Sequence, residues 1–149
     1  MNLNDIKIIP MSINNIDKVK DIETDQNINI LSKESILNDI KDEHSCYFVA
    51  ILDKEIVGYI AASIVIDNMD LESIVVKKEY QRKHIASYLL DFLFNIAKKK
   101  NVVSIFLEVR TSNIKAQNLY RKYGFEIINI RKKYYKDNLE DAFIMKKDL

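Results

Sequence analysis

The stretch NIKAQNLYRKYGF, residues 113–125, decides how the second half of this chain is interpreted. Asn113 is a typical helix N-cap residue, and Gly124 is a natural left-handed residue after a helix C-terminus. Between them the spacing predicts a short helix over Lys115–Tyr123. An aromatic residue such as Tyr120 on a short helix most often packs in the core or at its boundary.

The strand predicted just before this helix carries a carboxylate near its carboxyl end. Val102–Val109 is otherwise apolar, and Glu108 is its second-last residue. Open α/β sheets bind ligands beyond the carboxyl ends of their strands, so Glu108 is a candidate general base. It could equally pair with Arg110 or with another cation, and Asn113 could serve only as the helix cap.

A second strand-to-helix junction lies upstream. Asp70–Val76 is predicted as a strand, and the best amphipathic helix of the chain follows over Lys83–Lys99. A helix N-terminus presents unpaired N–H groups and a positive dipole end, where phosphate binds well. Arg82 and Lys83 add positive charge there. An ordinary turn with solvated cations is the competing interpretation.

The remaining segments complete the expected fold. We predict further strands over Ile6–Ile9, Tyr47–Leu52, Ile56–Ile66, Phe125–Tyr135 and Asp141–Lys147, and two further helices that begin at Ser12 or Asn14 and at Ser32. The order β-α-α-β-β-β-α-β-α-β-β predicts an α/β (α+β) fold with a mixed sheet and a βαβ crossover near its middle. Because Ile56–Ile66 is apolar on both faces, that strand is expected to be central.

Composition excludes several classes of protein. The 149 residues suit one domain, residues 1–149, and the 23 basic and 22 acidic side chains argue against a strongly basic nucleic-acid binder. One cysteine and two histidines give neither a disulfide framework nor a metal-ligand cluster, which favours a reducing, cytoplasmic location. With two glycines in all, no glycine-rich nucleotide loop can be present. No uncharged stretch approaches the roughly 20 residues of a membrane span.

Together these segments resemble the GCN5-related N-acetyltransferase (GNAT) superfamily. Residues 80–86, YQRKHIA, are similar to its acyl-CoA pyrophosphate loop, and residues 113–125 to its second motif. Residues 107–113, LEVRTSN, and residues 130–142, with their Tyr-Tyr and Glu-Asp-Ala segments, resemble the ribosomal-protein-alanine N-acetyltransferase (RimI-like) branch. The resemblance covers roughly residues 47–145. It implies the acyl-CoA N-acyltransferase fold, with a mostly antiparallel, twisted sheet of about seven strands and four helices.

The resemblance also implies a reaction. Acetyl-CoA would be the co-substrate, with no metal, and its acetyl group would pass directly to a primary amine, most simply the N-terminal α-amino group of a protein such as a ribosomal protein. Glu108 would be the general base and Tyr120 the general acid, while Tyr134 and Tyr135 would bracket the acceptor backbone. Cofactor contacts are implied for Ile74, Val75, Val76, Arg82, Lys83, His84, Ile85, Ala86, Ser87 and Asn113.

One position departs from the family pattern, and two other functions stay open. The family carries glycine where this chain has His84, whose Cβ and ring must point away from the cofactor or pack against it. An acetyltransferase for a small amine, such as a polyamine or an aminoglycoside, would share the cofactor motifs. A non-catalytic domain that binds CoA or another protein could keep the same fold.

Overall fold

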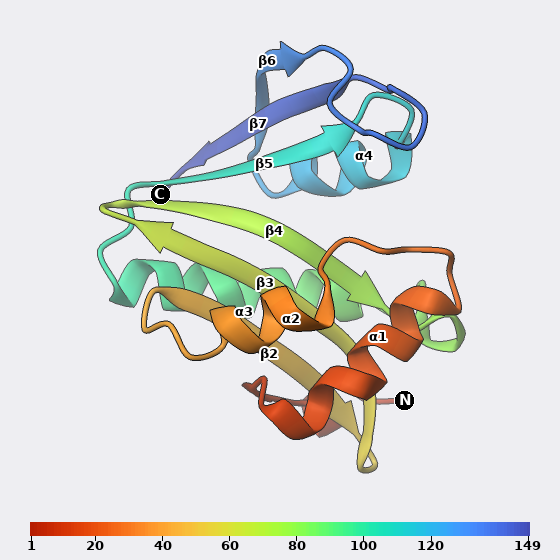
Figure 1. Cartoon of the computed structure of the whole chain (residues 1–149). Coiled ribbons are helices and arrows are strands. Elements are labelled where there is room, and N and C mark those ends of the chain that lie inside the picture. Colours follow the sequence, from red (N-terminus) through yellow and green to blue (C-terminus); the bar gives the residue numbers. More distant parts are fainter.

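Seven strands form one sheet in the order β1-β2-β3-β4-β5-β7-β6, in a computed structural model that describes residues 1–149 (Figure 1). The strands are β1 (Lys7–Pro10), β2 (Ser45–Leu52), β3 (Glu55–Val65), β4 (Asn68–Val76), β5 (Ser104–Arg110), β6 (Glu126–Arg131) and β7 (Ala142–Asp148). The helices are α1 (Ile16–Thr24), α2 (Lys33–Asp39), α3 (Ile85–Lys99) and α4 (Ile114–Lys122). Every neighbouring pair is antiparallel except β4 and β5. The expected mixed, mostly antiparallel sheet is therefore confirmed.

The helices cover the sheet on both faces. In Figure 1, α1 and α2 lie in front of β2, β3 and β4, and α3 lies behind them. Residues 57–62 of β3 are buried, as expected of a strand covered on both faces. One core cluster includes Leu89 and Leu93 of α3, and a second includes Val19 of α1 and Ile36 of α2. None of the helices has the length and apolar character that crossing a membrane requires.

The two parallel strands in the middle of the sheet separate along their length. Asn68–Asp70 pairs with Ser104–Phe106, and no further pairs form between β4 and β5. The strands diverge from that point toward their carboxyl ends (Figure 1). Opposite β3, the register skips Glu72, which makes it the extra residue of a β-bulge, and a bulge bends its strand. The second half of β4 is therefore a free edge inside the sheet.

Two predicted boundaries are wrong for local reasons, and one is confirmed. The helix expected from Lys83 begins at Ile85, because His84 has a left-handed backbone with φ +66°. Ser12, one of the two residues expected to cap the first helix, is the N-cap of a 3₁₀ turn over Ile13–Asn15 that continues directly into α1. The strand expected over Phe125–Tyr135 is only β6, because the chain turns away from the sheet after Arg131.

Candidate active site

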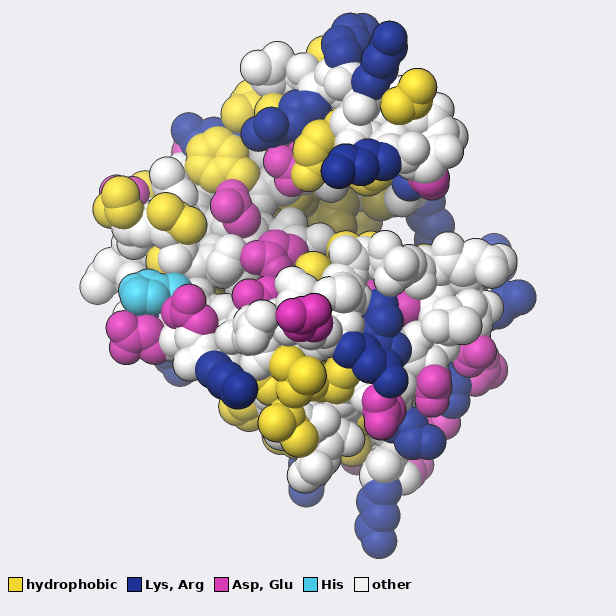
Figure 2. Space-filling view, viewed as in Figure 1, with side chains coloured by type: hydrophobic (Ala, Val, Ile, Leu, Met, Phe, Trp, Pro, Cys, Tyr) yellow, Lys and Arg dark blue, Asp and Glu magenta, His cyan; other side chains and the backbone are white.

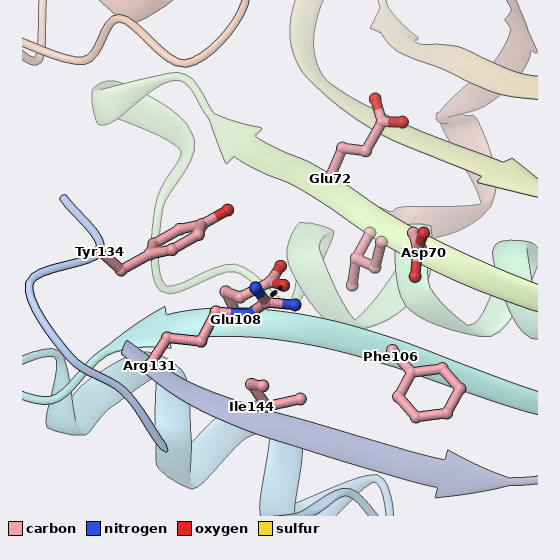
Figure 3. Close-up of a pocket in the computed structure, with 8 residues that line it drawn as sticks. Asp70, Glu72, Phe106, Glu108, Arg131, Tyr134 and Ile144 are labelled. Atoms are coloured by element: carbon pink, nitrogen blue, oxygen red, sulfur yellow. Dashed lines mark ion pairs between the residues drawn. The ribbon is translucent and has the colours of Figure 1, made fainter. Parts of the chain in front are cut away.

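A cavity of about 390 Å³ lies where β4 and β5 separate. It is lined by Asp70, Leu71, Glu72, Phe106, Glu108, Arg131, Tyr134 and Ile144. Figure 2 shows a hollow between the upper and lower parts of the molecule, with acidic side chains gathered along it. The lining residues drawn in Figure 3 come from β4, β5, β7, the end of β6 and the segment that follows it. A sheet that opens in its middle thus creates a site between two strands.

Glu108 lies on the wall of this cavity. Its side chain is 32% exposed, and its Oε1 atom is 3.6 Å from Nε of Arg131. Figure 3 shows the two side chains meeting between β4 and β5. The sequence left open whether Glu108 pairs with Arg110 or with another cation, and the partner is Arg131. This contact is long and leaves the carboxylate accessible, so Glu108 can still exchange a proton with a molecule in the cavity.

Tyr120 lies on α4 and is not among the residues that line the cavity. It is 8% exposed, and its ring packs edge-on against Phe125 with centroids 5.7 Å apart, which confirms the expected place at the core boundary. Burial, and secondarily nearby Tyr135, raises the pKa of Tyr120 to about 12. No side chain or backbone group of the chain hydrogen-bonds to its hydroxyl. Tyr120 therefore carries a proton at neutral pH and has no internal acceptor for it.

Ion pairs at the end of β5 hold the segment that carries Tyr134 and Tyr135. Arg110 contacts the Asp137 carboxylate at 2.9 Å and the Glu140 carboxylate at 3.2 Å, and its guanidinium carbon lies 3.9 Å from the Tyr135 ring centroid. The Tyr134 and Tyr135 rings pack edge to face at 5.1 Å. Tyr134 lines the cavity, whereas Tyr135 does not.

Glu140 ties the same segment to the turn after β5. The Ser112 N–H donates to its Oε2 atom at 2.8 Å. The bonds from Ser112, with those from Arg110 and Asn138, lower the pKa of Glu140 to about 2. Glu140 is therefore ionised throughout the neutral range and keeps this cluster of charges intact.

The loop before α3 presents a run of unpaired backbone donors. The N–H groups of residues 82–87 donate to no acceptor in the chain, and the next one, of Tyr88, donates to the His84 carbonyl. Arg82 and His84 both have left-handed backbones, with φ of +61° and +66°. His84 thus adopts the conformation for which glycine is preferred, at a cost of about 1–2 kcal/mol. Six free donors at the start of a 15-residue helix suit a pyrophosphate.

The free edge of β4 includes the other backbone groups expected to contact the cofactor. Ile74, Val75 and Val76 have no partner on the β5 side. The Val76 carbonyl accepts bonds from the side-chain amides of Gln26 and Gln81, at 2.9 and 3.1 Å. An unpaired strand edge can pair with an extended amide-containing ligand in the manner of an added strand.

Asn113 is the N-cap of α4, since its side chain accepts a bond from the Ala116 N–H at 3.1 Å. The cap interpretation is thus confirmed. A contact between Asn113 and the cofactor stays a prediction. No group of three or more His, Cys, Asp or Glu side chains is placed to hold a metal ion.

Sequence reasoning missed part of the site. It did not single out Asp70, Glu72 or Phe106 as lining residues, although the acidic Asp70 and Glu72 alternate with apolar residues over 69–72 of the sequence. That alternation places Asp70 and Glu72 together on one face, and it was the available signal. A second, more open hollow of about 740 Å³ brings residues 1–4 against Lys83 and His84, which no sequence pattern indicated.

Comparison with known proteins finds a family profile and relatives that match this chain. The family profile described as "Acetyltransferase (GNAT) family" matches residues 16–125. A Bacillus subtilis protein, named provisionally as a ribosomal protein bS18-alanine N-acetyltransferase, is 35% identical over 136 residues, which are 91% of this chain and 90% of that protein.

Two solved structures are similar over nearly the whole chain. The ribosomal-protein-S18-alanine N-acetyltransferase from Escherichia coli superposes with a TM-score of 0.88 at 28% identity, covering 96% of this chain and 93% of its own. The PaiA N-acetyltransferase from Thermoplasma acidophilum, solved in complex with coenzyme A, has a TM-score of 0.80 at 25% identity, covering 97% and 99%.

Proposed function

Because the chain belongs to the acetyltransferase (GNAT) family and is an acetyl-CoA-dependent N-acetyltransferase, we propose that its acceptor is the N-terminal α-amino group of a protein. The observation that carries the proposal is the cavity between β4 and β5, where Glu108 and Tyr134 share one wall. The names of the Bacillus subtilis and Escherichia coli relatives, both of which specify a ribosomal protein alanine, support this class of acceptor. The family and its acetyltransferase relatives support an enzyme over the non-catalytic alternative.

The chain's own residues fit the co-substrate at two places. In this proposal the unpaired N–H groups of residues 82–87 hold the pyrophosphate, with Arg82 and Lys83 adding charge. The free edge at Ile74–Val76 aligns the acetyl-pantetheine arm, and Asn113 contacts that arm. The bound molecule supplies a thioester, whose carbonyl carbon is then directed toward the cavity that contains Glu108.

The proposed chemistry needs one base and one acid. Glu108 accepts a proton from the acceptor ammonium, whose ordinary pKa of about 7.7–8.0 makes a modest base sufficient. The freed nitrogen lone pair forms the C–N bond, and the C–S bond breaks with its electron pair on sulfur. Tyr120 gives its proton to that thiolate, and it recovers one from solvent after the nitrogen releases its second proton. Tyr134 and Tyr135 bracket the acceptor backbone.

A small polyamine is the second candidate acceptor. It is favoured by the carboxylates of Asp70, Glu72 and Glu108 on the cavity wall, which face only one cationic side chain there, Arg131. A polyamine presents only ammonium groups, whereas a peptide also presents a backbone for Tyr134 and Tyr135 to contact.

Thiol release from acetyl-CoA, measured with each acceptor in turn, decides between these candidates. A peptide beginning Ala-Arg-Tyr is expected to give a kcat/KM at least about tenfold above that of spermidine, since one or two oriented contacts are worth about 1.4 kcal/mol. The same peptide with an acetylated N-terminus is the control and should be inert. A higher kcat/KM for spermidine would overturn the proposed acceptor.

A further inference from the structure

The free half of β4 is held from the α1–α2 face by side-chain hydrogen bonds. The Tyr47 hydroxyl lies 2.6 Å from Oε2 of the bulged residue Glu72. The next residue, Ser73, has its Oγ atom 2.7 Å from the Tyr59 hydroxyl. The Val76 carbonyl accepts from Gln26, which follows α1. These contacts hold the part of β4 that lacks backbone hydrogen bonds to β5, since the pairing of the two strands ends at Asp70.

One of these contacts leads to a buried carboxylate in α1. Glu23 is fully buried, and the Tyr59 hydroxyl donates to its Oε2 atom at 2.7 Å. Burial, and then the bond to Glu23, raises the pKa of Tyr59, so its hydroxyl keeps its proton. The Ser73 hydroxyl therefore donates to the Tyr59 hydroxyl, which in turn donates to Glu23. The acceptor at the end of this chain fixes the orientation of both hydroxyls.

The other oxygen of Glu23 connects to the loop between α1 and α2. Lys20 donates to Oε1 of Glu23, and the same ammonium group donates to the Leu31 carbonyl and to Oδ1 of Asn29. In Figure 1 this loop crosses in front of the second half of β4. A single buried carboxylate thus joins the free strand edge to the loop that covers it.

Stability alone does not account for this network. A buried ion pair loses most of its Coulomb energy to desolvation, and an apolar replacement of similar volume is often neutral or stabilising. What such a network provides is a fixed geometry, because the polar groups of Ser73, Tyr59, Glu23 and Lys20 are all held by hydrogen bonds to one another or to the loop. The geometry fixed here is that of Ser73, one residue before Ile74–Val76.

We infer that Glu23 is a positioning residue for acetyl transfer, which acts through Tyr59 and Ser73 on the free edge of β4 and through Lys20 on the 25–32 loop. The inference rests on the proposed use of that edge to align the acetyl-pantetheine arm. Glu23 touches neither substrate. When the network is lost, the edge shifts, and the thioester carbonyl leaves its alignment with the acceptor nitrogen. A misplacement of about 1 Å can cost about 10²-fold in rate.

The decisive variant replaces the three central side chains of the network by apolar ones, Lys20→Met, Glu23→Leu and Tyr59→Phe together, and leaves Ser73 in place. We expect a thermal unfolding midpoint within a few degrees of the wild type. The acetyl-CoA Kd should rise by no more than about threefold, because the proposed pyrophosphate contacts at residues 82–87 are kept and only the alignment of the arm along Ile74–Val76 changes. The kcat should fall by about 10- to 100-fold. Tyr59→Phe alone should lower kcat by about 3- to 10-fold, and it decides the question if the triple variant does not fold.

The chain offers a matched control. Lys33 and Asp17 form an ion pair at 2.8 Å between α2 and α1, with side chains 60% and 82% exposed. Breaking this exposed pair with Lys33→Met should leave kcat unchanged. Glu23→Gln, which can still accept from Tyr59 but not pair with Lys20, should retain more activity than the triple variant.

Two results would overturn the inference. One is a folded triple variant, or a folded Tyr59→Phe variant if the triple does not fold, with unchanged kcat. The other is a parallel loss of kcat and of acetyl-CoA affinity, which would indicate a general structural role. Rates are compared as ratios to the wild type on whichever amine it acetylates fastest. A preference for spermidine would therefore contradict the proposed acceptor without affecting this test.

Discussion

The two strands that border the opening are held by different kinds of interaction. The second half of β4 is fixed by buried hydrogen bonds, with Tyr59 and Glu23 both fully buried. The end of β5 and the segment after β6 are fixed by ion pairs near the surface, where Arg110 is 32% exposed and Asp137 is 64% exposed. Salt weakens interactions between exposed charges, over a Debye length of about 8–10 Å at 0.1–0.15 M, and it weakens those of buried groups much less. In the proposed function, the side that receives the cofactor is thus preformed, and the side that receives the acceptor can adjust.

The largest expected effect comes from the β5 side. Glu108→Gln removes the proposed base and should lower kcat by about 10²- to 10⁴-fold. The Kd of acetyl-CoA should stay the same, because the phosphate loop and the β4 edge are untouched. Turnover and calorimetric binding on the same preparation measure both quantities. Glu108→Asp should recover part of the rate, and a Glu108→Gln enzyme with normal kcat would remove Glu108 from the mechanism.

Tyr120→Phe tests the acid and should lower kcat by about 10²-fold. Because the pKa of Tyr120 is raised to about 12, its loss of a proton cannot cause a fall in wild-type rate below about pH 11. The substitution should lower kcat at every pH without shifting the pH values at which the rate rises and falls. A basic limb near pH 9 that disappears in Tyr120→Phe would contradict this assignment.

The same shift affects stability at high pH. A pKa raised above the unfolded value of about 10 stabilises the fold fully below pH 10, and this contribution is lost as the pH rises toward 12. The free energy of unfolding of Tyr120→Phe should therefore fall less steeply than that of the wild type between pH 10 and 12. Urea unfolding at a series of pH values checks this slope.

Arg110→Lys sharpens the contrast between the two sides. Lysine cannot form the paired contacts to Asp137 and Glu140 or stack on Tyr135 in the same way. We expect the KM for the peptide to rise about tenfold and the acetyl-CoA Kd to change less than twofold, since one lost charge-assisted contact is worth about 1.4 kcal/mol. Steady-state kinetics in low and high salt, with a binding titration of acetyl-CoA, measure these two quantities. Equal changes in the KM for the peptide and in the Kd for acetyl-CoA would contradict the separate roles of the two sides of the cavity.

Lowering the pH should affect the segment that follows β6 through the carboxylate of Glu140. Its pKa is lowered to about 2, so the stabilisation from its ionised form is present above the ordinary value of about 4.5 and is lost as the pH falls toward 2. The fluorescence of the neighbouring tyrosines should therefore show no change in this segment between pH 5 and 8. A transition there that Glu140→Gln abolishes would contradict the assigned direction.

The smallest expected effect is in the phosphate loop. His84→Gly removes a left-handed non-glycine residue, and it should tighten acetyl-CoA binding by a few-fold or raise stability by about 0.5–1 kcal/mol. His84→Val should do the opposite, because a β-branched residue tolerates positive φ poorly. Binding titrations of the two variants provide the comparison. Weaker binding by His84→Gly would mean that the ring contacts phosphate.

Local signals in the sequence were sufficient for much of the fold. Asn113 and Gly124 bracket a helix in the structure as they do in the sequence, and β3 is central as its apolar composition predicts. The family resemblance indicated Glu108 and Tyr134, and both line the cavity, while their roles stay predictions. The helix depends on residues close together in the chain, and the central place of β3 depends on the apolar composition of one strand.

Other features depend on contacts that no local pattern encodes. The bulge at Glu72 and the separation of β4 from β5 arise from how strands meet across the sheet. The strand predicted to Tyr135 was too long, because the chain turns after Arg131, where the Asp141 carboxylate accepts the Lys133 N–H. Glu23 falls at helical spacing from Ile16 and Val19, so its inward position could have been predicted, but its partners on distant strands could not.

The most direct test of this account is the position of the acetyl group in a product made by the purified protein. A peptide with a free N-terminal alanine and an internal lysine is incubated with acetyl-CoA, and fragment-ion mass spectrometry locates the modification. The account predicts acetylation of the α-amino group, lost in Glu108→Gln. Acetylation of the lysine side chain alone, or equal acetylation by Glu108→Gln, would contradict it.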